Sequence, residues 1–465
     1  MLLVLVAVSV LLPLGCFIVS MWRVKISQAV VCHFWYFTLI WMIAFPLRAV
    51  LIGYDFVEVN PLIPVERDPD VLGAALAVSL LLWGLAYLGF VSVSPRISVA
   101  ARSGGHQPAV WRSIVILALT VGLAMLFLSR TVMVGGEYRA FEGSEQLEAR
   151  VGAGAFFLMA ELFSFAAVVY VVRALVDSPY GVRSSRWILY GIVLALALLM
   201  TVAINSRRVL GIVLFVMAVE YSLRKPHRWA VCWLGVVGSI ALAPVFQMVR
   251  YLDVRLLLNG TVAVSELFDP VTARSFLTAL SSTFEGVDHL VEFLRRASLP
   301  QLIVGVDGGV AWLFNAGLAL VPRAIWPAKP LVTGSVAEQL FLYPEMFVEG
   351  PAVTTLPPSF VVDFAFGCGI PVGLLLAFLL GRVLAVLWQD LWNRDAPLPA
   401  RAVSLFVFVN VFNIVRGGTG VLQIILLFGV IVAGSLGVRE TGGVLASTAR
   451  RVMGRGWAPT AARPV

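Results

Sequence analysis

Arginines stand at two junctions between long apolar runs of this chain, where they could bind a phosphate-bearing ligand. The first junction has almost no loop and ends in Arg207 and Arg208. Two guanidinium groups at so short a turn are costly unless they meet an anion, and their planar fork matches phosphate oxygens. The alternative is that both side chains simply extend to the nearest aqueous surface. The sequence indicates phosphate or pyrophosphate binding here, with that alternative open.

The second junction, which begins at Arg416, repeats this design. Asn410, Asn413 and Arg416 recur every three residues, so they share one face of a short helix predicted over 402–415 and its end. The glycines that follow Arg416 allow a tight turn or a close backbone approach. The polar face could bind the same anion, or it could only form hydrogen bonds between helices.

Two candidate proton acceptors, Glu285 and His289, lie one helical turn apart and face the same way. A capping box that ends at Glu285, followed by apolar residues at helical spacing, predicts a helix over 282–298. We expect Leu299-Pro300 to end this helix. The alternative is that His289 is a surface residue paired with Glu285.

Further charged residues complete the candidate site. Arg323 and Lys329 flank a proline-rich stretch with Trp326, a residue that suits the headgroup zone of a membrane. Arg250 is a further candidate for binding the anion. Asp363 lies about one turn into a later apolar run, where a carboxylate is a functional candidate by default. Its alternative role is a structural ion pair with a nearby arginine.

Helices that cross a membrane must position these residues. The chain is 60% hydrophobic and 13% charged, with a mean hydropathy of +0.94. Its apolar runs of about 15–25 residues are long enough to cross a bilayer core, and they predict about eleven spans. The predicted spans are 2–20, 28–53, 71–94, 113–129, 153–172, 187–205, 209–222, 229–248, 359–381, 402–415 and 419–437. The expected fold class is therefore all-α, a polytopic transmembrane helical bundle.

Charge bias predicts the orientation of this bundle. Alternate connections are basic, and the intervening ones are acidic or mixed. Because basic connections face the cytoplasm, the N-terminus is expected outside and the C-terminus inside. The basic positions are Arg23, Lys25, Arg96, Arg102, Arg112, Arg173, Arg183, Arg186, Arg224, Lys225, Arg228, Arg382, Arg394, Arg401, Arg439, Arg450, Arg451 and Arg455. The net charge of +8 and the pI near 9.6 follow from this topology and do not indicate nucleic-acid binding.

Four regions follow from these spans. An N-terminal membrane bundle covers 1–248, and a large extracytoplasmic loop with short helices covers 249–358. C-terminal spans cover 359–438, and a basic cytoplasmic tail covers 439–465. We expect the stretch 247–358 to fold over the membrane surface as a lid, with an apolar segment at 309–321 that is too short to span.

The motifs of soluble enzymes are absent from the sequence. It contains no P-loop, no GxGxxG after a strand, no HExxH, no GxSxG and no paired DxD. The four cysteines fall inside predicted spans and none forms CxxC, so we expect neither a disulfide framework nor a metal site, and no cofactor. No internal repeat is evident, which weakens the case for an inverted-repeat transporter.

Several of these features together resemble the O-antigen polymerase (Wzy) family of oligosaccharide repeat-unit polymerases. The resemblance lies in Ser206-Arg207-Arg208 between two spans, in the late outer loop with Pro322-Arg323, Trp326-Pro327 and Lys329-Pro330, and in Pro358-Ser359, Asp363 and Gly367 at the start of the next span.

The resemblance implies a metal-independent membrane glycosyltransferase of GT-C-like architecture in the bacterial inner membrane, related to the O-antigen ligases. Such an enzyme moves a growing O-antigen, capsule or exopolysaccharide chain from undecaprenyl pyrophosphate to an incoming lipid-linked repeat unit. Its expected partners are these lipid-linked oligosaccharides, the bilayer and a chain-length regulator protein in the membrane, and nucleic acid is not among them.

The chemistry of this transfer fits the residues independently. Departure of pyrophosphate needs fixed positive charge, which the basic residues of the candidate site can supply. These are Arg207, Arg208, Arg250, Arg323, Lys329 and Arg416. The acceptor hydroxyl needs a general base, for which Asp363 is the first candidate and Glu285 or His289 the second.

Two other functions belong to different classes. A ligase-type transferase would share the chemistry but deliver the glycan to lipid A core. A polysaccharide or lipid transporter would need polar residues through successive spans to the cytoplasmic side. The charged residues inside the predicted bundle cluster near the outer face, which favours an enzyme.

Overall fold

The structure, a computed structural model, describes part of the chain. The described residues are 2–24, 28–29, 31–56, 68–93, 216, 218–219, 222, 230, 233–234, 284–306, 338, 340–344, 359–393, 396, 398–417 and 452. Every regular element within this part is a helix. The prediction of an all-α fold is therefore confirmed for these residues.

Four of the described helices are long and apolar enough to cross a membrane. They are α1 (Leu2–Arg23), the stretch His33–Gly53, α5 (Pro69–Ser92) and α18 (Phe360–Trp392). α1 exposes large apolar side chains along its length, as expected for a helix that faces lipid. Such helices are typical of a membrane protein. The predicted spans at 113–129, 153–172, 187–205, 209–222, 229–248 and 419–437 lie outside the described residues or touch them only at single positions.

Two predicted spans are longer than the sequence suggested. The predicted short helix at 402–415 is wrong, because α19 (Leu398–Gly417) has 20 residues. α19 begins four residues before the predicted start at 402. Pro399 is compatible with this start, because the backbone N–H groups of a first helical turn have no partner within the helix. α18 continues beyond the predicted end at 381, so Arg382 lies inside the helix and not in a connection. Its Nη1 donates to Ser92 Oγ at 3.2 Å, near the end of α5.

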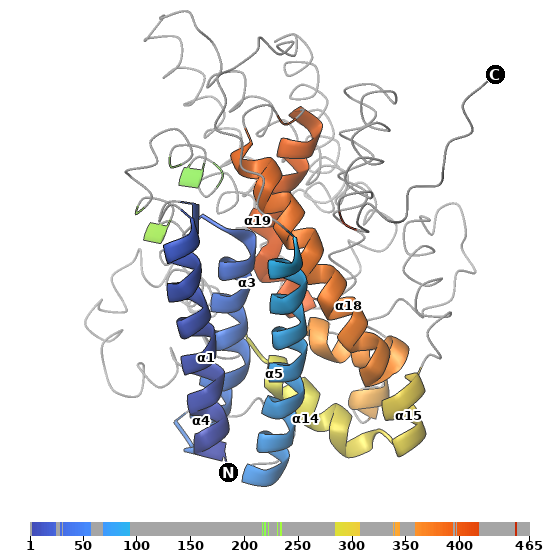
Figure 1. Ribbon diagram of the computed structural model, residues 1–465. Helices are drawn as coiled ribbons and strands as arrows, with labels where there is room; N and C mark the ends of the chain where they lie inside the picture. The colour runs from blue at the N-terminus through green and yellow to red at the C-terminus, as the bar shows by residue number, and fades with distance from the viewer. Residues whose placement is uncertain are drawn as a thin grey trace, which may run out of the picture.

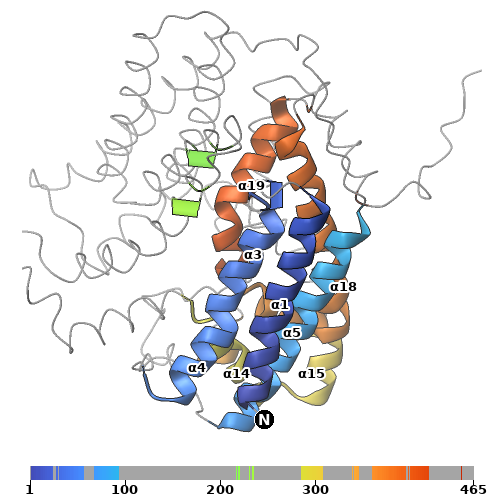
Figure 2. The same ribbon diagram turned by 60° about the vertical axis from the view of Figure 1, so that its left-hand side comes forward.

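The described helices have two distinct ends (Figures 1 and 2). One end holds the start of α1, the end of α4 (Arg48–Gly53) and the start of α5, whereas α19 ends about midway along these helices, at the level of Ala44. The opposite end holds Arg23, Ser92, Trp392 and the start of α19. This arrangement agrees with the sequence pattern, which separates the connections into a basic set and an acidic or mixed set.

One membrane-length helix changes its winding in the middle. α3 (His33–Met42) continues into the π-helix η1 (Ile43–Leu47) and then into α4. Pro46 lies inside η1, where its ring and missing N–H disturb the regular α-helical ladder. A π-turn absorbs this disturbance and rotates the residues that follow, and such turns are frequent at functional sites. The first residue after η1 is the buried Arg48.

An aromatic core joins this helix to α5. Phe34 stacks on Phe90 with ring centroids 4.7 Å apart, and Trp41 stacks on Trp83 at 5.7 Å. Trp83 Nε1 donates to Thr38 Oγ1 at 3.1 Å, so the polar edge of this ring is satisfied inside the bundle.

α5 and α18 cross at glycines. A Cβ on Gly89 would overlap the carbonyl oxygen of Phe378, and a Cβ on Gly381 would overlap the carbonyl oxygen of Ala86. The two backbones are therefore in direct contact. Small residues that permit such an approach are the usual means of packing helices inside a membrane.

α18 is broken near its start. Gly369 has φ 77° and ψ 165°, which separates a short segment at 360–368 from the longer stretch that follows. The short segment is buried throughout and contains Asp363 in its first turn. Asp363 therefore does lie about one turn into this helix, as predicted, but before the break.

The described part of the large loop forms two helices, α14 (Gly286–Arg296) and α15 (Leu299–Val304). The predicted helix start at 282 is wrong in detail, because Phe284 and Glu285 form a turn and Glu285 makes no side-chain cap hydrogen bond. Leu299-Pro300 does not end a helix but begins the next one, since proline is favoured in a first helical turn.

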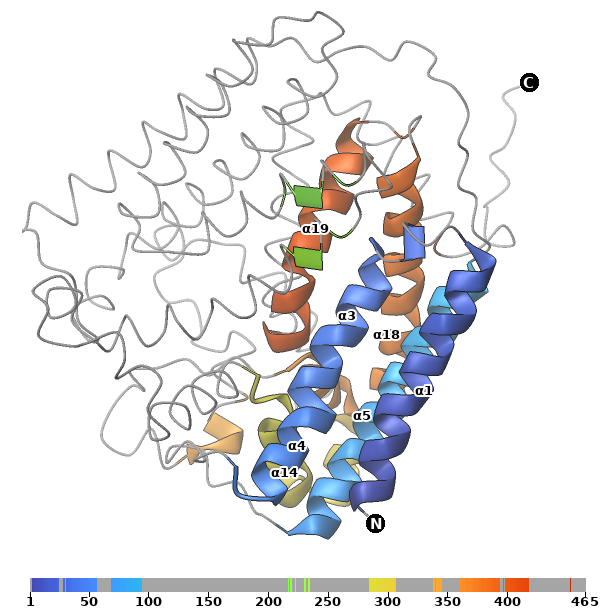
Figure 3. The ribbon, with the colours of Figure 1, turned by 90° about the vertical axis from the view of Figure 1, so that its left-hand side faces the viewer.

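α14 lies across the end of the bundle and packs against η1, α5 and α18 (Figures 1 and 3). All its residues from Gly286 to Phe293 are buried. This part of the loop is therefore ordered and packed on the bundle, and the lid over the membrane surface stays a prediction. α14 also carries the buried Asp288, whose partner Arg48 lies on the membrane-length stretch His33–Gly53.

Candidate functional site

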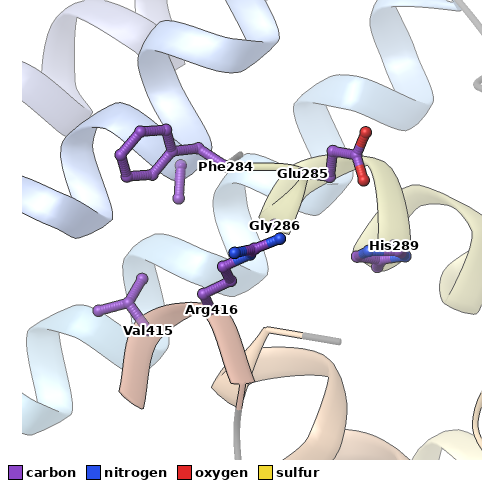
Figure 4. Close-up of a pocket in the computed structure, with 7 residues that line it drawn as sticks. Phe284, Glu285, Gly286, His289, Val415 and Arg416 are labelled. Carbon is purple, nitrogen blue, oxygen red and sulfur yellow. The ribbon is translucent and has the colours of Figure 1, made fainter. Parts of the chain in front are cut away.

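A small pocket lies where α14 meets the end of α19 (Figure 4). It is lined by Ala44, Phe284, Glu285, Gly286, His289, Val415 and Arg416. Three of these, Glu285, His289 and Arg416, are candidate site residues from the sequence. Figure 4 shows the Arg416 side chain extending from α19 toward the turn that carries Glu285. The structure thus brings a carboxylate, an imidazole and a guanidinium from two distant parts of the chain to one place.

Gly286 makes the close approach of α14 possible. A Cβ at this position would lie 3.0 Å from the Phe45 ring and 3.4 Å from Ala44 Cβ, both on η1. On the other side, Phe284 packs edge-on against Phe412 of α19, with ring centroids 5.3 Å apart. The N-terminus of α14 therefore packs between η1 and α19, and these contacts position the pocket residues of α14.

His289 is a buried residue, so its interpretation as a surface residue is wrong. It is 2% exposed, and its Nδ1 lies 2.8 Å from the hydroxyl of Tyr343. Burial lowers the pKa of His289 to about 4, Asp288 opposes this change, and Arg416 and Arg48 add to it. The imidazole is therefore neutral near pH 7.

Tyr343 keeps its proton in this setting. Burial raises the pKa of Tyr343 far above its ordinary value, and the nearby carboxylates of Asp288, Glu292 and Glu285 raise it further. A phenol is a stronger acid than a neutral imidazole, so its O–H is the natural donor to His289 Nδ1. The other ring nitrogen of His289 then carries the hydrogen and is a donor.

A buried ion pair ties α14 to the bundle. Arg48 Nη2 lies 2.6 Å from Asp288 Oδ2, and Arg48 Nε lies 3.2 and 3.3 Å from the two carboxylate oxygens. The side chains are 1% and 0% exposed. Sequence reasoning missed this pair, although an arginine within the apolar run 28–53 is itself a signal of function.

The far end of α14 has its own charge pairing. Glu292 is buried and accepts from Arg295 at 2.7 Å and also from Arg296. Both arginines lie in the last turn of the helix, where a positive charge is favoured by the helix dipole. The buried acids of α14 at 288 and 292 thus each have an arginine partner.

Asp363 is 1% exposed and does not contribute to the lining of the pocket. Its backbone N–H donates to the Ser359 carbonyl at 3.0 Å, within the first turn of α18. Asn413 Nδ2 donates to Asn410 Oδ1 at 3.0 Å, and Asn410 Nδ2 donates to the Phe406 carbonyl at 2.9 Å, so these bonds lie within α19 and do not join it to another helix. Arg207, Arg208, Arg250, Arg323 and Lys329 lie outside the described residues.

The charges at the pocket favour a negatively charged group beside it. Arg416 and the N-terminus of α14 both bring positive potential to the pocket. Glu285 offers a carboxylate on the same lining, and His289 offers a neutral ring.

Comparisons with protein-family models, curated proteins and solved structures find no match to this chain.

Proposed function

We propose that this chain is a membrane glycosyltransferase that polymerises lipid-linked oligosaccharide repeat units at the outer face of the bacterial inner membrane. The observation that carries the proposal is the pocket that joins Glu285, His289 and Arg416. Glu285 and His289 come from the large loop, which the sequence predicts outside the membrane, and Arg416 comes from the last turn of α19. About eleven spans, an outside N-terminus and a GT-C-like architecture belong to the same proposal.

The proposed reaction is a single displacement at the anomeric carbon of the donor. A hydroxyl of the acceptor repeat unit forms the new C–O bond, and the bond from the anomeric carbon to undecaprenyl pyrophosphate breaks. The leaving pyrophosphate takes the bonding electron pair, and the hydroxyl proton goes to a carboxylate of the protein.

Each pocket residue has a role in this proposal. Glu285 accepts the proton, because it is the carboxylate on the pocket lining. Arg416 stabilises the charge that develops on the leaving pyrophosphate. His289 donates from the ring nitrogen that faces away from Tyr343, so it acts as a hydrogen-bond donor to the anion. Asp363, the first candidate from the sequence, becomes the second candidate for the base.

A deletion strain gives the first test. If the chain is the polymerase, the strain makes glycans that carry only single repeat units. If it is a ligase, long polymer accumulates on the lipid carrier and is missing from its acceptor. Unchanged polymer length together with a loss of export to the cell surface would instead support a transporter.

A reconstituted assay gives the direct test. The lipid extract of the deletion strain supplies the lipid-linked repeat units, and the purified protein is added in lipid nanodiscs. We expect a ladder of longer chains and the release of undecaprenyl pyrophosphate. Absence of both products, with a protein that keeps its helical circular dichroism spectrum, would refute the proposed activity.

A further inference from the structure

α15 presents an apolar face to its surroundings. Leu299 is 71% exposed, Ile303 is 53% exposed and Val304 is 59% exposed, and no residue of the helix is buried. Leu299 and Ile303 lie on one side of the short helix, since residues four apart share a face, and Val304 follows Ile303. Three large apolar side chains together on an exposed surface are a feature of binding or membrane-contact sites.

This face continues onto α18. The backbone of α15 at Ile303 lies directly against Gly369, and Val306 N–H donates to the Phe366 carbonyl at 2.7 Å. About one turn beyond Gly369, α18 begins its own row of exposed apolar residues, Val372 and Leu375. The stretch after the break is long enough to cross the roughly 30 Å core of a bilayer. α15 therefore borders a surface that faces lipid.

The level of α15 in the bundle leads to the same conclusion. Figures 1 and 2 place α15 at the height of the first turns of α1. These turns expose Leu3 at 61% and Val4 at 67%, and they belong to the apolar stretch Leu2–Trp22 that can span a membrane. The apolar band of the protein thus extends to the level of α15.

Hydrogen bonds within the protein involve polar groups at both ends of α15. The Gln301 side-chain oxygen accepts from the Ser298 N–H and from the Ser298 hydroxyl, each at 2.9 Å. At the other end, Gly305 N–H donates to the Gln301 carbonyl at 2.9 Å. Backbone groups in contact with hydrocarbon must be satisfied in this way, because lipid offers no hydrogen bonds.

We propose that α15 lies in the hydrocarbon region of the bilayer, with Leu299, Ile303 and Val304 in contact with lipid acyl chains. This part of the large loop is then a membrane-inserted element and not an aqueous one. Arg295 precedes it and is paired with Glu292, and the long aliphatic stem of an arginine allows its charge to extend toward headgroups. The proposal does not depend on the proposed function.

Spin labelling in nanodiscs tests this placement. In a variant whose four cysteines are replaced by alanine, single cysteines are introduced as Leu299→Cys and Ile303→Cys and spin-labelled. Leu375→Cys on α18 is the reference for lipid, and Asp70→Cys, an exposed position in the first turn of α5, is the reference for water. Collisions with molecular oxygen and with a water-soluble nickel chelate are then compared.

We expect the labels at 299 and 303 to collide with oxygen as at 375, and to collide at least several-fold less with nickel than at 70. Nickel access as high as at 70 would overturn the proposal, and so would labels shielded from both reagents, since that indicates a protein cover. Should the cysteine-free variant fail to fold, the unchanged protein is irradiated with lipids that carry a diazirine on the acyl chain. Adducts on the peptide 299–304 support the proposal, and their absence when α18 is labelled contradicts it.

Discussion

The Arg48–Asp288 pair shows how single residues hold the loop in the bundle. Each charge alone would be expensive to bury, and the two together satisfy one another through several hydrogen bonds. The pair also joins residues on either side of the pocket, because Arg48 follows η1 and Asp288 precedes His289. Its geometry therefore controls where the pocket residues of α14 lie.

We predict that Asp288→Asn lowers the free energy of unfolding by about 3–5 kcal/mol, since it leaves the Arg48 guanidinium buried without its counter-charge. The double variant Arg48→Met with Asp288→Leu should regain a large part of this loss, because no buried charge remains. Thermal unfolding of the parent, Arg48→Met, Asp288→Leu and the double variant in the same detergent measures the double-mutant cycle. Additive losses from the two sites would show that the residues do not stabilise one another.

His289 makes a separate prediction about pH. Its pKa is about 4 in the folded protein and 6.5 as the ordinary value, so the unfolded chain binds the proton first as the pH falls. The stability that His289 contributes is therefore complete above pH 6.5 and is lost as the pH falls to about 4. The loss amounts to roughly 3 kcal/mol. Unfolding midpoints between pH 4 and pH 8 should show a shallower dependence in His289→Asn, and equal slopes in both proteins would contradict the burial of a neutral ring.

At the scale of helices, the crossing of α5 and α18 depends on missing side chains. Gly381→Ala places a methyl group against the Ala86 carbonyl, and we expect a loss of about 1–3 kcal/mol from overpacking. Gly84→Ala is the matched control on α5, because no atom lies within 4 Å of its Cβ position. There we expect a small gain of up to about 1 kcal/mol, since alanine favours helix more than glycine does. Equal effects at the two positions, measured by thermal unfolding, would argue against the close crossing.

The helices themselves were largely predictable because their length and apolar content follow from the bilayer. The runs near 2–20 and 71–94 correspond to α1 and α5 within a few residues. Local signals at the loop were less reliable. The pattern that ends at Glu285 satisfies a capping box, but packing of Gly286 against Phe45 and Ala44 decides where α14 begins. The break at Gly369 also arises from a distant contact, with Ile303, which no local pattern contains.

At the scale of the whole molecule, the pocket is a product of long-range folding. Glu285, His289 and Arg416 were candidates because of residue type and spacing, but their meeting depends on α14 entering the bundle beside α19. Tyr343 and Arg48 were missed because nothing near them in the sequence shows that they contact His289 and Asp288. Residue chemistry can be predicted locally, whereas partners separated by 240 residues cannot.

We predict that Arg416→Gln reduces polymer formation in the nanodisc assay by roughly 10²–10³-fold, the usual loss when a group that stabilises developing negative charge is removed. Arg295→Gln is the control, because it removes a positive charge of α14 from a half-exposed side chain outside the pocket lining. Its activity should stay close to that of the parent. Equal loss in both variants would show that polymer formation depends on the total positive charge and not on Arg416 in particular.

The assignment of the base gives the decisive prediction for the molecule as a whole. Glu285→Gln keeps the shape and the hydrogen-bonding capacity of the side chain but cannot accept a proton, so chain extension should fall by about 10²–10⁴-fold while lipid-linked substrate still binds. Asp363→Asn lies outside the pocket lining and should retain much more activity if it remains folded. The assay measures the polymer ladder for both variants, alongside binding of the lipid-linked unit and helical content. If Asp363→Asn loses extension with intact folding and Glu285→Gln does not, the base lies on α18. The transfer then takes place beside the break at Gly369 and not at the pocket between α14 and α19.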